Sequence, residues 1–177
     1  MLRRLYRALQ AVSEWTGRAI AWLTAFMVLV TFAIVVLRYA FNVGWIAMQE
    51  SVLYMHAMVF LLGAAYTLKH EGHVRVDIFY RKLGPRGQAW VDLIGTLVFL
   101  FPLSVFIIWT SWDYVASSWA LKEGSREAGG LPWVYLLKTV MPLMAVLLCV
   151  EGLAQVLRNI LTLRGQGPDH PRSEVEV

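Results

Sequence analysis

This sequence has few charged residues and almost no cysteine. Asp, Glu, Lys and Arg make up 16% of its 177 residues, compared with about 25% in soluble domains. Cys149 is its single cysteine, which excludes an intrachain disulfide and a paired CxxC motif. The sequence also lacks a Gly-rich phosphate loop, an EF-hand loop and a recognisable nucleophile–base arrangement. We therefore expect a protein that is not an enzyme.

Apolar residues are abundant, at 58% of the chain, and they form four blocks. The blocks cover about residues 17–37, 47–68, 88–110 and 134–157, and each is long enough to cross a bilayer as a helix. The basic segment before the first block resembles a signal peptide, but the block is too long for the apolar part of one. We predict an all-α integral membrane protein with one four-span domain over residues 1–164. A disordered cytoplasmic tail is expected over residues 165–177.

The basic residues indicate the orientation of these spans. Twelve of the 16 lie before or at the start of the first span, between the second and third spans, or after the fourth. Positively charged loops stay in the cytoplasm, so both termini are predicted to be cytoplasmic. Because the basic residues flank apolar blocks and form no single groove, we exclude nucleic acid as a partner. The segment between spans two and three is predicted to be a short amphipathic connector that binds membrane lipids at the inner surface through Arg75, Arg81, Lys82 and Arg86.

The second span carries polar residues along one face. Gln49, His56, Gly63 and His70 recur every seven residues, which keeps them in a narrow stripe on a helix. Ionisable side chains seldom face lipid, so the stripe predicts contact with protein. Packing inside the four-helix unit, docking against a different membrane protein, and a ligand or proton pathway are all compatible with this pattern.

Acidic residues near the ends of the spans suggest contacts between helices. Glu50 opens span two, and we expect it to pair with Arg38 at the end of span one. Asp92 in span three and Glu151 in span four lie at similar depth near the cytoplasmic side. We expect the polar groups around these two acids to satisfy one another and to fix the register of the helices.

Histidines offer one candidate metal site. His70 and His73 lie close to two acidic residues, but their spacing differs from the HExxH zinc motif, and Gly72 interrupts a helix between them. A bis-histidine haem needs one histidine on each of two facing helices, whereas only His56 lies deep within a span. We expect no metal and no cofactor in this chain.

Three ordered local patterns lie between about residues 15 and 160. RYAFN closes span one (38–42) and is followed by Trp45 and the pair Gln49-Glu50. FLLGAAYTLKHEGHVRVDIFY covers the end of span two and the connector (60–80). GSREAGGLPWVYLLKTVMP leads into the last span (124–142).

Together these patterns resemble the small membrane subunit of tripartite ATP-independent periplasmic (TRAP) transporters, the DctQ-like family. His73 and Asp77 match the family's His-x-x-x-Asp connector, which follows a Gly-Ala-Ala helix end. Pro132 and Trp133 match its entry to the last span. Many members have two acids where this chain has Gln49-Glu50.

The resemblance implies an accessory role. Such transporters take up organic acids and related solutes with a sodium gradient, a periplasmic substrate-binding protein captures the solute, and a large multi-span subunit holds the sodium and substrate sites. The small subunit is then a scaffold in the bacterial inner membrane that packs against the large subunit and binds no sodium itself. Structural or interface roles are expected for Arg38, Asn42, Trp45, Gln49, Glu50, His56, Gly63, His73, Asp77, Asp92, Pro132, Trp133 and Glu151.

Two other functions remain open from the sequence. One is a membrane-anchor subunit of a redox enzyme complex, which a Soret band in the purified protein would favour. The other is a free-standing four-span assembly protein, which would purify alone and show no link to transport.

Overall fold

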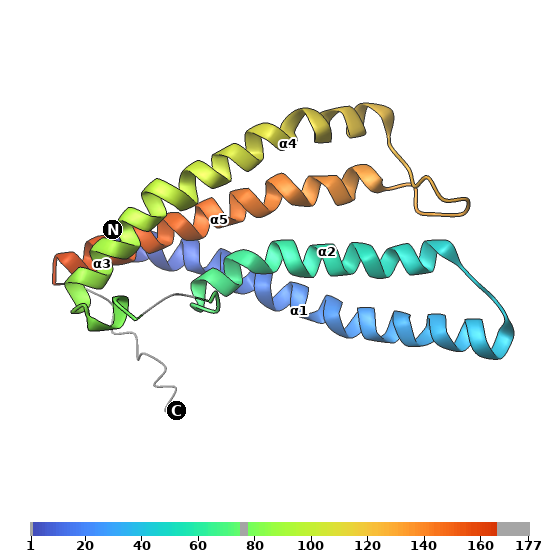
Figure 1. The fold of residues 1–177 in the computed structure, drawn as a ribbon, viewed down its shortest axis with the longest axis horizontal. Helices are drawn as coiled ribbons and strands as arrows, with labels where there is room; N and C mark the ends of the chain where they lie inside the picture. Colours follow the sequence, from blue (N-terminus) through green and yellow to red (C-terminus); the bar gives the residue numbers. More distant parts are fainter. Residues whose placement is uncertain (1, 75–77, 166–177) are drawn as a thin grey trace.

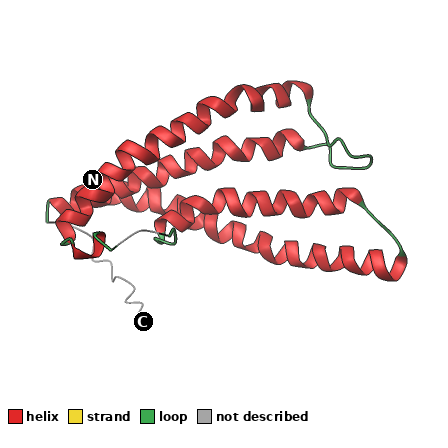
Figure 2. Ribbon diagram, viewed as in Figure 1, coloured by secondary structure: helices red, strands yellow, loops and turns green. Residues whose placement is uncertain are grey.

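The computed structural model describes residues 2–74 and 78–165. This part of the chain consists of helices and connectors, without a strand (Figure 2). The α-helices are α1 (Leu2–Phe41), α2 (Ile46–Lys69), α3 (Pro85–Gly95), α4 (Phe101–Leu121) and α5 (Val134–Leu163). A single 3-10 turn, η1 (Tyr80–Lys82), precedes α3, and a π-helical turn, η2 (Thr96–Leu100), joins α3 to α4.

Four helical segments of the described residues are long and apolar enough to cross a membrane: α1, α2, the continuous α3–η2–α4 segment and α5. This confirms the predicted all-α class with four spans. Each predicted span lies inside one of these segments, but the helices continue beyond the spans. With 40 residues, α1 extends about 60 Å, roughly twice the thickness of the hydrocarbon core. The predicted tail, apart from Gly165, lies outside the described residues.

The helices form two hairpins, α1 with α2 and α4 with α5 (Figure 1). We call the end that holds the N-terminus, α3 and the last turns of α5 the inner end, and the end that holds the connectors 42–45 and 122–133 the outer end. The central helix is α5, which contacts α1, α2, α3 and α4. Its buried positions include Ala145, Gly152 and Ala154, and such small residues let helix backbones approach closely.

Gly17 marks a close approach between α1 and α2. A Cβ atom on Gly17 would lie 2.0 Å from Cδ2 of Tyr66, a distance that no side chain can adopt. Gly63 on α2 differs, because a Cβ atom there would lie 3.6 Å from Cδ1 of Ile20, an ordinary contact. The Tyr66 ring can therefore pack against α1 because residue 17 is glycine.

A stripe of serines lies on the buried face of α4, which packs against α5. Ser104, Ser111 and Ser118 are seven residues apart and all buried. The Ser111 hydroxyl donates to the backbone oxygen of Ile107 at 2.6 Å, so it is satisfied within its own helix. Small residues at this spacing allow close helix packing in a membrane. The residues predicted from the sequence do not include this stripe, although its seven-residue spacing is the same signal as that of the polar stripe of α2.

The π-helical turn η2 ends at Leu100, two residues before Pro102. Proline lacks a backbone N–H, and its ring crowds the carbonyl group four residues earlier. Widening the preceding turn is one way in which a helix accommodates such an interruption. The helix then continues to Leu121, and Lys122 ends it in the left-handed conformation with φ 48°.

Candidate functional site

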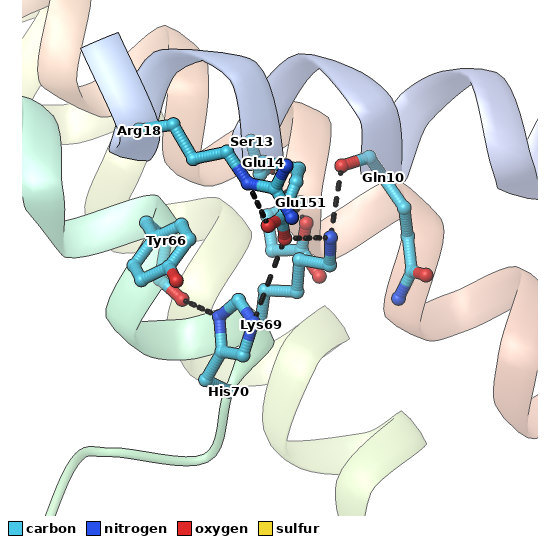
Figure 3. A network of polar contacts seen from close by, with 8 residues as sticks. All are labelled: Gln10, Ser13, Glu14, Arg18, Tyr66, Lys69, His70 and Glu151. Atoms are coloured by element: carbon cyan, nitrogen blue, oxygen red, sulfur yellow. Dashed lines mark hydrogen bonds and ion pairs between the residues drawn. The ribbon is translucent and has the colours of Figure 1, made fainter. Parts of the chain in front are cut away.

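Most polar side-chain contacts between helices lie in two clusters, one at each end of the bundle. Glu14 is the hub of the inner cluster (Figure 3): its carboxylate accepts from Lys69 Nζ at 2.6 Å and from Arg18 Nε at 2.8 Å. His70 Nε2 lies 3.5 Å from the same carboxylate. These contacts tie the first turns of α1 to the end of α2. The inner cluster consists of Ser13, Glu14, Arg18, Lys69, His70 and Glu151.

Glu151 is the most deeply buried member of the inner cluster, with 1% of its surface exposed. The Ser13 hydroxyl donates to Glu151 Oε2 at 2.7 Å, which joins α1 to α5. A buried carboxylate is unfavourable unless hydrogen-bond donors or opposite charges replace its lost water. The Ser13 hydroxyl supplies one such donor, and Lys69 lies in the same cluster (Figure 3).

The connector that follows α2 is fastened to α3 and α5. Arg158 Nη1 on α5 lies 3.3 Å from Glu71 Oε1, and Arg158 Nη2 lies 3.9 Å from Asp92 Oδ2. The Tyr80 hydroxyl donates to the same Asp92 oxygen at 2.8 Å. The expected contact between polar groups of the third and fourth spans is therefore formed by Asp92 and Arg158, whereas Glu151 bonds to α1.

Glu50 is the centre of the outer cluster. Its carboxylate accepts hydrogen bonds from the Ser125 hydroxyl and from the backbone N–H of Leu131, the latter at 2.6 Å. A Cβ atom on Gly130 would lie 2.8 Å from Glu50 Oε2, so the loop backbone closes directly onto this carboxylate. Glu50 thus binds the N-terminal part of α2 to the 122–133 loop between α4 and α5.

The predicted ion pair between Arg38 and Glu50 is wrong. The Arg38 side chain is exposed and takes part in no ion pair among the described residues. The helix α1 ends just beyond it, where Asn42 adopts the left-handed conformation with φ 55°. Glu50 instead finds its donors in a loop 75 positions away along the chain.

Glu123, at the start of the same loop, binds side chains of α4 and α5. Its carboxylate accepts from Lys138 Nζ at 2.5 Å and from the Ser118 hydroxyl at 2.7 Å. The bond from Lys138, followed by that from Ser118, lowers the pKa of Glu123 below its usual value. Beside it, Lys122 Nζ lies 4.6 Å from the centre of the Trp119 ring, within cation–π distance.

Removal of the Glu50 carboxylate is expected to free the loop. Glu50→Leu leaves the Leu131 N–H and the Ser125 hydroxyl without their acceptor, and unpaired polar groups favour exposure to water. Trypsin should then cleave the purified protein faster at Arg126. Arg38→Gln is the matched control, because Arg38 forms no ion pair in the described structure. Equal cleavage rates in both variants would show that Glu50 does not hold the loop.

The polar stripe of α2 points partly outward. Gln49 and His56 are exposed, and they share a face with Leu53 and Phe60, which are 60% and 73% exposed. The other two members of the stripe lie beside α1: Gly63 is close to Ile20, and His70 Nε2 lies 3.5 Å from the Glu14 carboxylate. Packing inside the four-helix unit is therefore the wrong interpretation for Gln49 and His56.

Other predicted residues lie at the ends of helices. Asn42 forms the turn after α1, and Trp45, 61% exposed, directly precedes α2. Pro132 and Trp133 are exposed just before α5. His73 is exposed beyond α2, and its Nε2 lies 3.3 Å from the Ala64 backbone oxygen.

The predicted inner lipid surface is described in part. Arg81 and Lys82 belong to η1 and Arg86 to the first turn of α3, and all three residues are exposed at the inner end. Arg75 and Asp77 lie outside the described residues. Within residues 2–74 and 78–165, no three His, Cys, Asp or Glu side chains gather as a possible metal site.

This geometry defines a multi-pass membrane protein whose polar side chains mainly hold its own helices together. Residues 27–162 match the family described as tripartite ATP-independent periplasmic transporters, DctQ component. The match covers most of the chain, and the chain belongs to this family. Proteins of this family are transporter subunits and not enzymes.

Two curated relatives support this assignment. The C4-dicarboxylate TRAP transporter small permease protein DctQ of Vibrio cholerae serotype O1 is 29% identical over 121 residues, which cover 64% of this chain and 52% of that protein. A Haemophilus influenzae protein with the provisional name TRAP transporter small permease protein is 35% identical over 88 residues, covering 50% and 54%. This chain thus spans about half the length of each relative. No solved structure gives a significant match.

Proposed function

We propose that this chain is the small accessory subunit of a sodium-coupled secondary transporter of the TRAP type in the bacterial inner membrane. It enlarges the static scaffold of a large multi-span subunit, which binds the sodium and the solute. A periplasmic substrate-binding protein delivers the solute, an organic acid or a related compound. Family membership supports this role, and the name of the Vibrio relative, a C4-dicarboxylate transporter subunit, favours an organic acid.

The inner end faces the cytoplasm in this proposal. Arg3, Arg4 and Arg7 belong to the inner end of α1, and Arg81 and Arg86 lie in the elements η1 and α3 beside it. This distribution agrees with the tendency of positively charged segments to remain in the cytoplasm. The 122–133 loop then faces the periplasm, where the substrate-binding protein acts.

The proposal of a membrane partner rests on the exposed polar residues of α2. Gln49 and His56 project from a helix that is long and apolar enough to span the membrane. Polar side chains within a span usually face protein or water, because contact with hydrocarbon is unfavourable. The large subunit covers this face and offers hydrogen-bonding groups to both side chains.

Leu53→Trp is expected to disrupt assembly, because it adds a bulky ring to the middle of this face. Leu103→Trp is a matched control: Leu103 lies on α4 and is 56% exposed, against 60% for Leu53. The test compares co-purification of the large subunit and sodium-driven uptake in cells that express each variant. Leu53→Trp should reduce both measures at normal membrane abundance, while Leu103→Trp should reduce neither.

Two results would contradict this account. Equal behaviour of the two variants would mean that the α2 face looks toward lipid. Normal uptake in a strain that lacks this chain altogether would contradict the accessory role itself.

A further inference from the structure

The first four turns of α1 have an apolar surface that residues 2–74 and 78–165 leave uncovered. Leu5, Val12 and Trp15 are 52%, 42% and 75% exposed. These residues precede the first apolar block, and α1 is about 60 Å long, too long to fit upright within a ~30 Å hydrocarbon core. This exposed surface therefore extends past the part of α1 that is needed to span the bilayer.

The side chains of this segment divide into three sectors around the helix. At 3.6 residues per turn, Tyr6, Ser13 and Gly17 share one sector, and all three are buried. The exposed apolar side chains of Leu5, Val12 and Trp15 form the next sector. The third sector contains the exposed arginines at positions 4, 7 and 18.

The charge of the segment is strongly one-sided. Residues 2–18 contain four arginines and a single acidic residue, Glu14. Glu14 is already paired with Lys69 at 2.6 Å and with Arg18 at 2.8 Å. The exposed arginines at positions 4 and 7 therefore add positive charge that no acidic residue of this segment balances.

We propose that residues 2–15 lie in the inner headgroup layer and bind anionic phospholipid. Leu5, Val12 and Trp15 insert at the boundary between headgroups and acyl chains. Arg4 and Arg7 contact the lipid phosphates. Because the buried sector is fixed to the bundle through the Ser13–Glu151 hydrogen bond, the segment holds the whole inner end against the membrane surface.

Lipid fits this surface better than a protein partner does. Exposed apolar residues next to an arginine-rich sector are typical of helices that lie in the membrane interface. Tryptophan favours the headgroup boundary, and Trp15 is the most exposed of the three apolar residues. The exposed basic residues of η1 and α3, Arg81, Lys82 and Arg86, belong to the same end of the molecule and add to its positive charge.

The first experiment measures the depth of the segment in the membrane. The full chain carrying Cys149→Ala is spin-labelled at Leu5→Cys or Val12→Cys in nanodiscs that contain phosphatidylglycerol. Both labels should lie in the headgroup layer, accessible to oxygen and protected from a water-soluble nickel reagent. A label at Ala128→Cys, in the exposed outer loop, is the water-accessible control. Free access of the nickel reagent to both helix labels would overturn the proposal.

The second experiment tests the charge. Native mass spectrometry measures how much phosphatidylglycerol and how much phosphatidylcholine stay bound to each variant. The test variant is Arg4→Gln/Arg7→Gln. The control variant, Arg38→Gln/Arg126→Gln, removes the same charge from the outer end. The inner variant should lose preference for the anionic lipid by about tenfold, and the control should keep it. Equal losses in both variants would overturn the proposal. Protection of the helix labels only in the presence of the large subunit would also overturn the proposal, because the segment would then be a protein interface.

Discussion

Glu151→Ala is expected to lower the free energy of unfolding by about 2–4 kcal/mol, because it removes a buried hydrogen-bonded carboxylate and leaves a cavity. Ser13, a residue only 1% exposed, then has no acceptor for its hydroxyl, and an unpaired buried group is itself unfavourable. Glu151→Gln should have a smaller effect, since its amide oxygen can still accept from Ser13. Tryptophan fluorescence during chemical unfolding in mild detergent measures these differences.

Glu127→Ala is the matched control for this prediction. Glu127 is an exposed acidic residue of the outer loop, so its loss should change stability by no more than about 0.5 kcal/mol. The double variant Ser13→Ala/Glu151→Leu separates the hydrogen bond from the charge. It should recover part of the stability lost in Glu151→Ala, because apolar replacement of both partners removes the unpaired groups. Equal stability of Glu151→Ala and Glu127→Ala would refute the structural role of Glu151.

Gly17→Ala is the second change with a large expected effect, a loss of about 1–3 kcal/mol, which is typical of overpacking a core. The new Cβ atom would lie 2.0 Å from Cδ2 and 2.3 Å from Cγ of the Tyr66 ring. The ring is attached close to its own backbone, so it cannot move aside without separating α1 from α2. The melting temperature of the purified protein gives the size of the effect.

The same substitution at Gly63 should be tolerated. A Cβ atom at Gly63 meets only the flexible end of Ile20, at 3.6 Å, and alanine favours a helix over glycine by up to about 1 kcal/mol. Gly63→Ala should therefore leave the melting temperature unchanged or raise it slightly. A similar loss at both positions would indicate a general effect of replacing helix glycines and not a close contact at Gly17.

The four spans could be predicted from the sequence because long apolar blocks signal helices in a bilayer wherever their partners lie. Contacts between helices depend on tertiary geometry that such a pattern does not contain. The Ser13–Glu151 hydrogen bond joins residues 138 positions apart, and nothing near either residue indicates the other. Helix ends were also hard to place, since α1 begins well before its first apolar block.

Gln49, His56 and Glu50 differ in how far the sequence near them predicts their surroundings. The seven-residue spacing correctly placed Gln49 and His56 on one face, and the structure adds that both are exposed. Pairing Glu50 with Arg38 assumed that charges close in sequence meet in space. Glu50 instead accepts the Leu131 N–H at 2.6 Å, because a loop from the other hairpin folds back over the start of α2. A backbone donor gives no signal in a sequence.

Co-purification from the native membrane tests the central claim most directly. The chain is tagged, extracted in a mild detergent that preserves other membrane complexes, and isolated, and the proteins that accompany it are identified and quantified. The accessory-subunit account predicts one large multi-span membrane protein in stoichiometric amount, together with sodium-dependent uptake when the pair is reconstituted with its substrate-binding protein. A haem-containing or soluble redox partner, or the chain alone under these conditions, would contradict it.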